Sequence, residues 1–399
     1  MSNSRLLKPE THRYYLIDDN ENEANESDIS NQQEDSINIP PKDHYQIVYL
    51  IFFLQGVAML LGWNVFITAS VFFHSRFLGS PYSDNFQNYF SIVNMGSNLL
   101  FLTHALYTQT TANVSVRLIF SLFVSAFTFF AITVSTQFLE LFTPSGYFYF
   151  AITLVFLIGM TTAYQQNAIF GIVALFPPKY TQAVMSGQGL AGLAISLSQI
   201  FSALAVDQTS NQTPAGDDLT LSTFIYFLSA FAVILVSLVS YFILIRLPLY
   251  IYHVSPDLTF VNQGVDNSLN ERSYKNTFNK INKLIFAVAF VFCVTLSVYP
   301  SITSFIKFAG QISTISRRAG DNQSESNSIY VDLSCYFLAI NTAMQSVSNG
   351  YVGSLAMMAG PQVVGVEKDL AGILLSYFLV VGLTVGSIFS FPLRAISWA

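Results

Sequence analysis

The chain has 399 residues, of which 52% are hydrophobic and only 10% are charged, and its formal net charge is −6. Soluble domains carry about 25% charged residues, so this composition excludes a soluble multi-domain enzyme. Ten of the acids lie in residues 1–45 and the remainder is balanced between acids and bases, which leaves no basic surface and therefore no expected nucleic-acid partner.

Residues 1–45 are polar and rich in Asn, Glu and Ser. They contain too little apolar surface to form a core, so we expect a disordered, acidic, cytoplasmic tail. Cys293 and Cys335 lie in apolar runs and indicate neither a disulfide framework nor a metal site. No cofactor and no metal is expected.

Nine long, nearly uncharged stretches follow the tail. A helix of about twenty apolar residues crosses the hydrocarbon of a bilayer, because its backbone groups are bonded within the segment. The sequence therefore predicts an all-α, polytopic membrane helix bundle. The predicted spans cover residues 46–73, 86–108, 117–139, 147–176, 181–206, 220–245, 283–304, 331–358 and 370–392.

The spans fall into two groups separated by a polar connection. We expect an N-terminal six-helix bundle at 46–246, a cytoplasmic loop at 247–282 and a shortened C-terminal bundle of three helices at 283–399. With the N-terminus in the cytoplasm, twelve basic residues lie on the cytoplasmic side and five on the other. Because basic residues favour the cytoplasmic side, this orientation is predicted, with a non-cytoplasmic C-terminus.

Polar residues inside the first two spans are candidates for solute contact. The first span contains Trp63 and Asn64, and the second carries Asn94 and Asn98 on one helix face. An indole can stack on a flat base, and an amide in hydrocarbon needs a hydrogen-bonding partner. An interfacial anchor and helix–helix hydrogen bonds explain the same residues, so both interpretations stay open at this point.

The fourth and fifth spans add two further amides. Gln166 lies near the middle of the fourth span, and a glutamine amide can pair with the edge of a nucleobase or with sugar hydroxyls. Gln188 stands within a run of small residues that favours close helix packing. The predicted packing positions are Gly187, Gly189 and Gly192 in the fifth span, and Gly382 and Gly386 in the last.

No enzyme signature is present, and proton or ion sites in membranes usually need ionisable groups. A neutral, hydroxyl-rich or amide-rich solute that moves down its gradient fits these spans better than an ion-driven pump.

Four motifs together resemble the equilibrative nucleoside transporter family. The resemblance covers about residues 46–304 and 331–396, in the family's order. Its motifs are LLGWNVFITA at 60–69, MSGQGLAG at 185–192, SNGY at 348–351 and the closing stretch from Gly382 to Ala395.

The resemblance implies a fold related to the major facilitator superfamily, with eleven helices, and facilitative movement of purine and pyrimidine nucleosides, and in some members nucleobases, by alternating access. It implies that Trp63 and Asn64 line the substrate cavity, that Gln166 reads the base, and that Gly187 and Gly192 support transport and packing.

This chain departs from the family in its C-terminal half, which has three predicted spans where the family has five. Two crossings are expected to be missing, with the junction between about residues 302 and 342. The expected function is facilitative nucleoside transport in the plasma membrane or a vacuolar or lysosomal membrane. The alternative is a non-transporting, truncated protein that associates with full-length relatives and modulates them.

Overall fold

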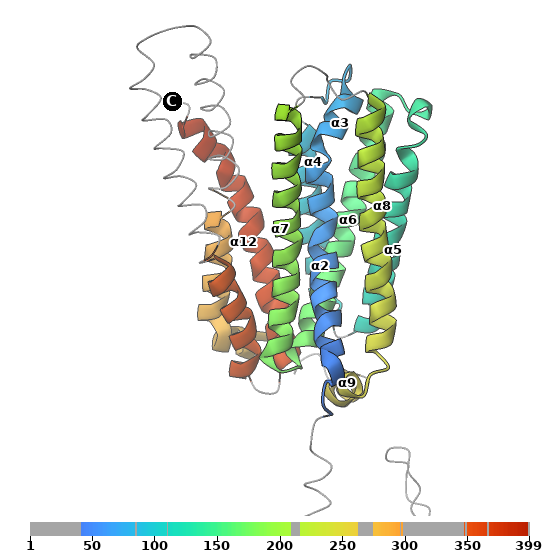
Figure 1. Ribbon diagram of the computed structural model, residues 1–399. Coiled ribbons are helices and arrows are strands. Elements are labelled where there is room, and N and C mark those ends of the chain that lie inside the picture. The colour runs from blue at the N-terminus through green and yellow to red at the C-terminus, as the bar shows by residue number, and fades with distance from the viewer. Residues whose placement is uncertain are drawn as a thin grey trace, which may run out of the picture. The chain divides into compact units, whose positions relative to one another are not determined.

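The computed structural model describes residues 41–83, 86–109, 111–208, 216–261, 274–295, 297, 347, 349–364 and 367–397. Figure 1 shows the described chain as long helices that run side by side. The helices up to the polar connection are α2 (Ile47–Thr68), α3 (Ser70–Phe77), α4 (Phe86–Tyr107), α5 (Val114–Ser135), α6 (Pro144–Ala174), α7 (Pro178–Gln208) and α8 (Gly216–Leu244).

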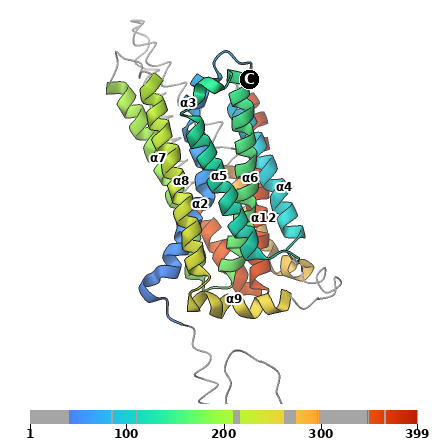
Figure 2. The same ribbon diagram turned by 90° about the vertical axis from the view of Figure 1, so that its right-hand side faces the viewer.

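The later helices are α9 (Pro248–Val261), a helix at Tyr274–Thr295, helical residues 349–364, and α12 (Lys368–Ser397). Figure 2 shows α9 lying across the end of the bundle rather than along it. The predicted connection at 247–282 therefore contains a helix that hydropathy does not reveal. The next membrane-length helix begins nine residues before the predicted boundary at 283.

Local capping explains why two helices begin earlier than their apolar runs. The Asn113 side chain accepts hydrogen bonds from the backbone N–H groups of Ser115 and Val116, 3.0 and 3.3 Å away, and starts α5. Thr143 accepts from the Gly146 N–H at 3.1 Å and is followed by a proline at the first helical position. Both are favoured helix starts.

The distribution of side chains on α5 is the reverse of that in a soluble protein. Large aromatic residues lie exposed on one face, whereas Ser121, Ser125 and Thr128 are buried. The exposed residues are Phe120, Phe123, Phe127 and Phe130. Apolar side chains that face outward while hydroxyls are satisfied inside suit a helix that lies in lipid.

Six described helices are long and apolar enough to span a bilayer. They are His44–Thr68, Val114–Ser135, Pro144–Ala174, Thr223–Leu244, Tyr274–Thr295 and Lys368–Phe389. These helices confirm the predicted all-α, polytopic membrane bundle. Residues 1–40 of the predicted tail at 1–45, the junction between about 302 and 342, and most of the predicted span 331–358 lie outside the described residues. The count of nine spans therefore stays a prediction.

Helix α6 is the helix around which the site is built, because it contacts α2, α4, α5 and α12. Helix α2 packs along α7, and α8 packs against α5 and α2. Helix α12, from the C-terminal half of the chain, lies against α6 and α4. Residues of α6 therefore face both halves of the protein.

The start of α2 is fixed by one carboxylate. Asp43 accepts hydrogen bonds from the backbone N–H groups of Val48 and Tyr49 at 3.1 and 3.3 Å, and from the Tyr180 hydroxyl at 3.1 Å. Burial, together with the Asp43 charge, raises the pKa of Tyr180, so its hydroxyl stays protonated and donates at neutral pH. This contact ties the start of α2 to the start of α7.

Candidate functional site: buried amides around helix α6

Three consecutive amides on α6 point at different neighbours. Successive helical residues are rotated by about 100°. The Gln165 Nε2 lies 3.4 Å from the Ser125 Oγ on α5, and the Gln166 Nε2 lies 3.3 Å from the Ser376 carbonyl oxygen on α12. Asn167 turns its Oδ1 toward α5, where an arginine donates to it. The three amides thus have three separate hydrogen-bond partners.

Gln166 is the sequence-predicted site residue that reaches the C-terminal half. Its side chain is only 5% exposed, and its amide is the donor in the contact with Ser376. Both partners belong to membrane-length helices, so this hydrogen bond lies between α6 and α12 within the bundle. A single hydrogen bond of this length is easily exchanged for another partner.

The predicted pair on α2 lies beside α6. A Cβ at the preceding Gly62 would lie 2.9 Å from the Ile158 Cγ2 and 3.9 Å from the Thr162 Oγ1, so α2 and α6 approach closely here. Trp63 is half-buried and packs against the aromatic cluster around Phe66. The Nδ2 of Asn64 is buried and has no hydrogen-bond partner among the described residues.

Asn94 and Asn98 both lie buried on α4, as their shared face predicts. Their side chains are 3% and 7% exposed. Within the described part of the chain, neither Oδ1 atom has a hydrogen-bond donor. Helix α6 presents Gly159 to this face, because a Cβ at Gly159 would collide with the Ser97 Oγ.

Trp63, Asn64 and Asn94 lie at similar depth in the bundle. The rings of Phe66 on α2 and Phe90 on α4 are 6.3 Å apart between centroids. Since α2 and α4 run in opposite directions, the residues one turn further inward on each helix are also level. Gln166 lies about two turns further along the bundle than Asn98, because Gly159 is level with Ser97 and Tyr164 with His104. The name amide layer is used here for Trp63, Asn64, Asn94, Asn98 and Gln166.

Gln188 lies at the edge of this layer. Its Nε2 is 3.0 Å from the Met59 Sδ on α2, and thioether sulfur is a weak acceptor. The amide is half-buried. Gln188 therefore retains most of its hydrogen-bonding capacity while lying beside α2.

The predicted packing glycines divide into two groups. A Cβ at Gly187 would collide with the Phe53 carbonyl oxygen, and Cβ atoms at Gly382 and Gly386 would collide with the carbonyls of Ala289 and Cys293. By contrast, a Cβ at Gly189 or Gly192 would meet no described atom within 4 Å. Close helix crossings therefore lie at the first three positions, and the structure leaves room for a side chain at the other two.

Arg117 is the main feature that hydropathy missed. The predicted span 117–139 begins at this residue, which is expected to lie at the cytoplasmic end, yet Arg117 is only 8% exposed. Its Nη1 donates to the Ala105 carbonyl at 2.9 Å and to the Asn167 Oδ1 at 2.8 Å, and its Nη2 donates to the carbonyl and hydroxyl oxygens of Thr108 at 3.2 and 3.1 Å. Arg117 thereby ties the last turn of α4 to α6.

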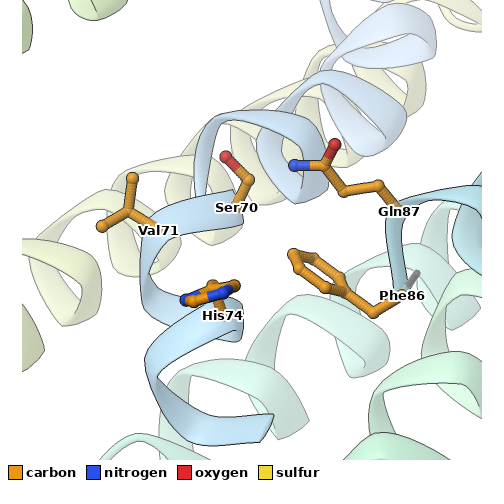
Figure 3. Close-up of a pocket in the computed structure, with 5 residues that line it drawn as sticks. All are labelled: Ser70, Val71, His74, Phe86 and Gln87. Atoms are coloured by element: carbon orange, nitrogen blue, oxygen red, sulfur yellow. The ribbon is translucent and has the colours of Figure 1, made fainter. Parts of the chain in front are cut away.

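A separate open pocket lies at the other end of α4. It is lined by Ser70, Val71 and His74 of α3 and by Phe86 and Gln87 of α4. Figure 3 shows the Phe86 ring and the Gln87 amide on one side of the pocket and the His74 ring on the other. Gln87 lies on the same helix face as Asn94, but about two turns away from it.

The fold defines a multi-pass helical membrane protein, and amides gathered inside such a bundle are typical of a carrier for polar solutes. Comparison with known proteins supports this class. A family model described as "Nucleoside transporter" matches residues 151–263 and 319–395. Human equilibrative nucleoside transporter 1 is 27% identical over 474 residues, which cover 89% of this chain and 98% of that protein.

Two further relatives are also named as equilibrative transporters. Human equilibrative nucleoside transporter 2 is 24% identical, with 89% of this chain and 98% of the relative covered. Arabidopsis thaliana equilibrative nucleotide transporter 1 is 25% identical, with 94% of this chain and 92% of the relative covered. The family model and these relatives together support the resemblance of this chain to the equilibrative nucleoside transporter family.

Proposed function

We propose that this chain is a facilitative carrier that moves purine and pyrimidine nucleosides across a membrane by alternating access. Nucleoside transport is the activity named for the family model that it matches and for the human relatives it resembles. The proposed substrate contacts are the amide layer together with Gln188. In this proposal the N-terminus lies in the cytoplasm and the C-terminus on the opposite side.

The chemistry of the layer suits an uncharged solute. Its members are neutral amides and an indole, which offer donors, acceptors and a flat apolar surface without a fixed charge. A nucleoside presents the complementary groups: ring nitrogens, carbonyls, hydroxyls and an aromatic face. Binding by such groups needs no ion to neutralise the substrate.

The observation that carries the proposal is the position of Gln166 between α6 and α12. Its amide donates to the Ser376 carbonyl at 3.3 Å. When a base takes over that donor, this hydrogen bond between α6 and α12 is lost. Substrate binding is thereby coupled to separation of the two helices, as alternating access requires.

The test compares Gln166→Leu with Gln165→Leu in proteoliposomes that contain the purified chain. Both substitutions remove a buried amide from α6, but Gln165 faces Ser125 on α5. We expect Gln166→Leu to raise the KM for adenosine and uridine about three- to tenfold, the value of one hydrogen bond. Gln165→Leu should leave KM unchanged.

Equal KM values for the two variants would remove Gln166 from the site. Absence of uptake by the correctly inserted wild-type chain would remove the transport proposal. In that case, co-purification with a full-length relative would support the alternative of a modulatory protein.

A further inference from the structure

Helix α4 contains two buried amide oxygens that no described residue satisfies. They are the Oδ1 atoms of Asn94 and Asn98, on side chains that are 3% and 7% exposed. A buried acceptor without a donor is costly, so native structures seldom retain one unless a ligand or water supplies the bond. Two such atoms on one helix face therefore lack a donor from the described part of the chain, and a bound solute can supply one.

Among the described residues, two neighbours of these amides offer no free donor. Ser97, between the two amides in sequence, donates its hydroxyl to the Asn94 carbonyl oxygen at 3.1 Å. The facing residue of α6 is Gly159, which has no side chain to donate. The two acceptors are four residues apart and so about 6 Å apart along the helix axis.

Helix α2 offers the opposite chemistry at the same depth. The unpartnered atom on Asn64 is Nδ2, a donor, and the adjacent Trp63 supplies an aromatic surface. The approach of Phe66 to Phe90, with centroids 6.3 Å apart, aligns the two helices at this level. The layer therefore has a donor and a ring on α2, and two acceptors on α4.

We propose that Asn94 and Asn98 accept hydrogen bonds from the sugar hydroxyls of the substrate, while the base lies toward Trp63 and Asn64. This assignment rests on the proposed function and divides the substrate between two helices. Nucleobases carry acceptors and a flat face, which match α2, whereas ribose hydroxyls are donors, which match α4. Two acceptors one turn apart match two hydroxyl groups better than a single exocyclic amine.

The test measures discrimination between sugars rather than overall activity. Proteoliposomes that contain the purified chain are assayed for initial uptake of labelled adenosine, 2′-deoxyadenosine and 2′,3′-dideoxyadenosine. The variants are Asn94→Leu and Asn98→Leu, which replace an amide by a side chain of similar shape. Asn88→Leu is the matched control, since Asn88 is an exposed asparagine on the same helix.

We expect the wild-type chain to prefer adenosine to the dideoxy compound. Each of the two variants should lower that preference about three- to tenfold, the effect of one hydrogen bond, mainly by slowing adenosine uptake. Asn88→Leu should leave the preference unchanged. Uptake ratios are independent of the amount of folded protein, so partial misfolding of a variant does not mimic this result.

A proportional loss of uptake for all three substrates in both variants would overturn the assignment of the sugar to α4 and leave nucleoside transport standing. Wild-type uptake that does not distinguish the three sugars would also overturn it. Absence of uptake of any nucleoside by the inserted wild-type chain would overturn the proposed function itself.

Discussion

At Arg117 a positive charge is held inside a membrane-length helix by four hydrogen bonds. Two go to the backbone carbonyls of Ala105 in the last turn of α4 and of Thr108 just after it, one to the Thr108 hydroxyl and one to Asn167 on α6. The last carbonyls of a helix have no partner within it and carry partial negative charge. The guanidinium thus satisfies the end of α4 and fixes it to α6.

This contact predicts coupled effects on stability. We expect Arg117→Met and Asn167→Leu each to lower the stability of the detergent-solubilised chain, because each leaves a buried polar group without its partner. The double variant should be more stable than the sum of the two effects predicts, by about 1–3 kcal/mol. Thermal unfolding of the four proteins measures this coupling. Arg246→Met, at an exposed arginine, is the control.

Additive effects within about 0.5 kcal/mol would show that Arg117 and Asn167 do not interact in the folded protein.

At the scale of elements, α6 shows what the sequence could and could not predict. Its length and position follow from hydropathy, and Thr143 and Pro144 explain its start. Gln166 could also be predicted as a site residue, because it is an amide near the middle of a membrane span. The separate partners of Gln165, Gln166 and Asn167 could not be predicted, because they depend on which helix lies at each angle around α6.

Arg117 and α9 were missed for related reasons. A lone arginine at the edge of an apolar run looks like an interfacial residue. Arg117 is buried only because its side chain packs against the end of α4 and against α6. Helix α9 has apolar residues mixed with polar ones inside a polar connection. Its helical state depends on packing that local hydropathy does not report.

The crossing of α2 and α7 depends on two glycines. A Cβ at Gly56 would collide with the Val184 carbonyl oxygen, and one at Gly187 with the Phe53 carbonyl oxygen. Since backbone atoms cannot move aside as a side chain can, we expect Gly187→Ala to force the helices apart and cost about 1–3 kcal/mol. Gly189→Ala should be tolerated, because no described atom lies within 4 Å of its Cβ position.

The melting temperature and the monodisperse fraction in size-exclusion chromatography test the glycine prediction. Equal behaviour of the two alanine variants would contradict a close α2–α7 crossing at Gly187.

At the scale of the whole molecule, this chain matches its relatives along most of their length but is shorter than they are. The alignment with the human transporter runs over 474 residues, which is longer than this 399-residue chain, so the relative contains segments without a counterpart here. That two crossings are missing stays a prediction. The amide layer uses α2, α4 and α6 of the N-terminal half and touches the C-terminal half through α12.

The central claim is that this chain by itself carries nucleosides down their gradient. The direct measurement is counterflow: proteoliposomes that contain the purified chain are loaded with unlabelled uridine and exposed to a trace of labelled uridine. We expect a transient accumulation of label above equilibrium, unaffected by an imposed pH gradient or membrane potential. Label entry no greater than in protein-free liposomes, with the chain correctly inserted, would contradict the account.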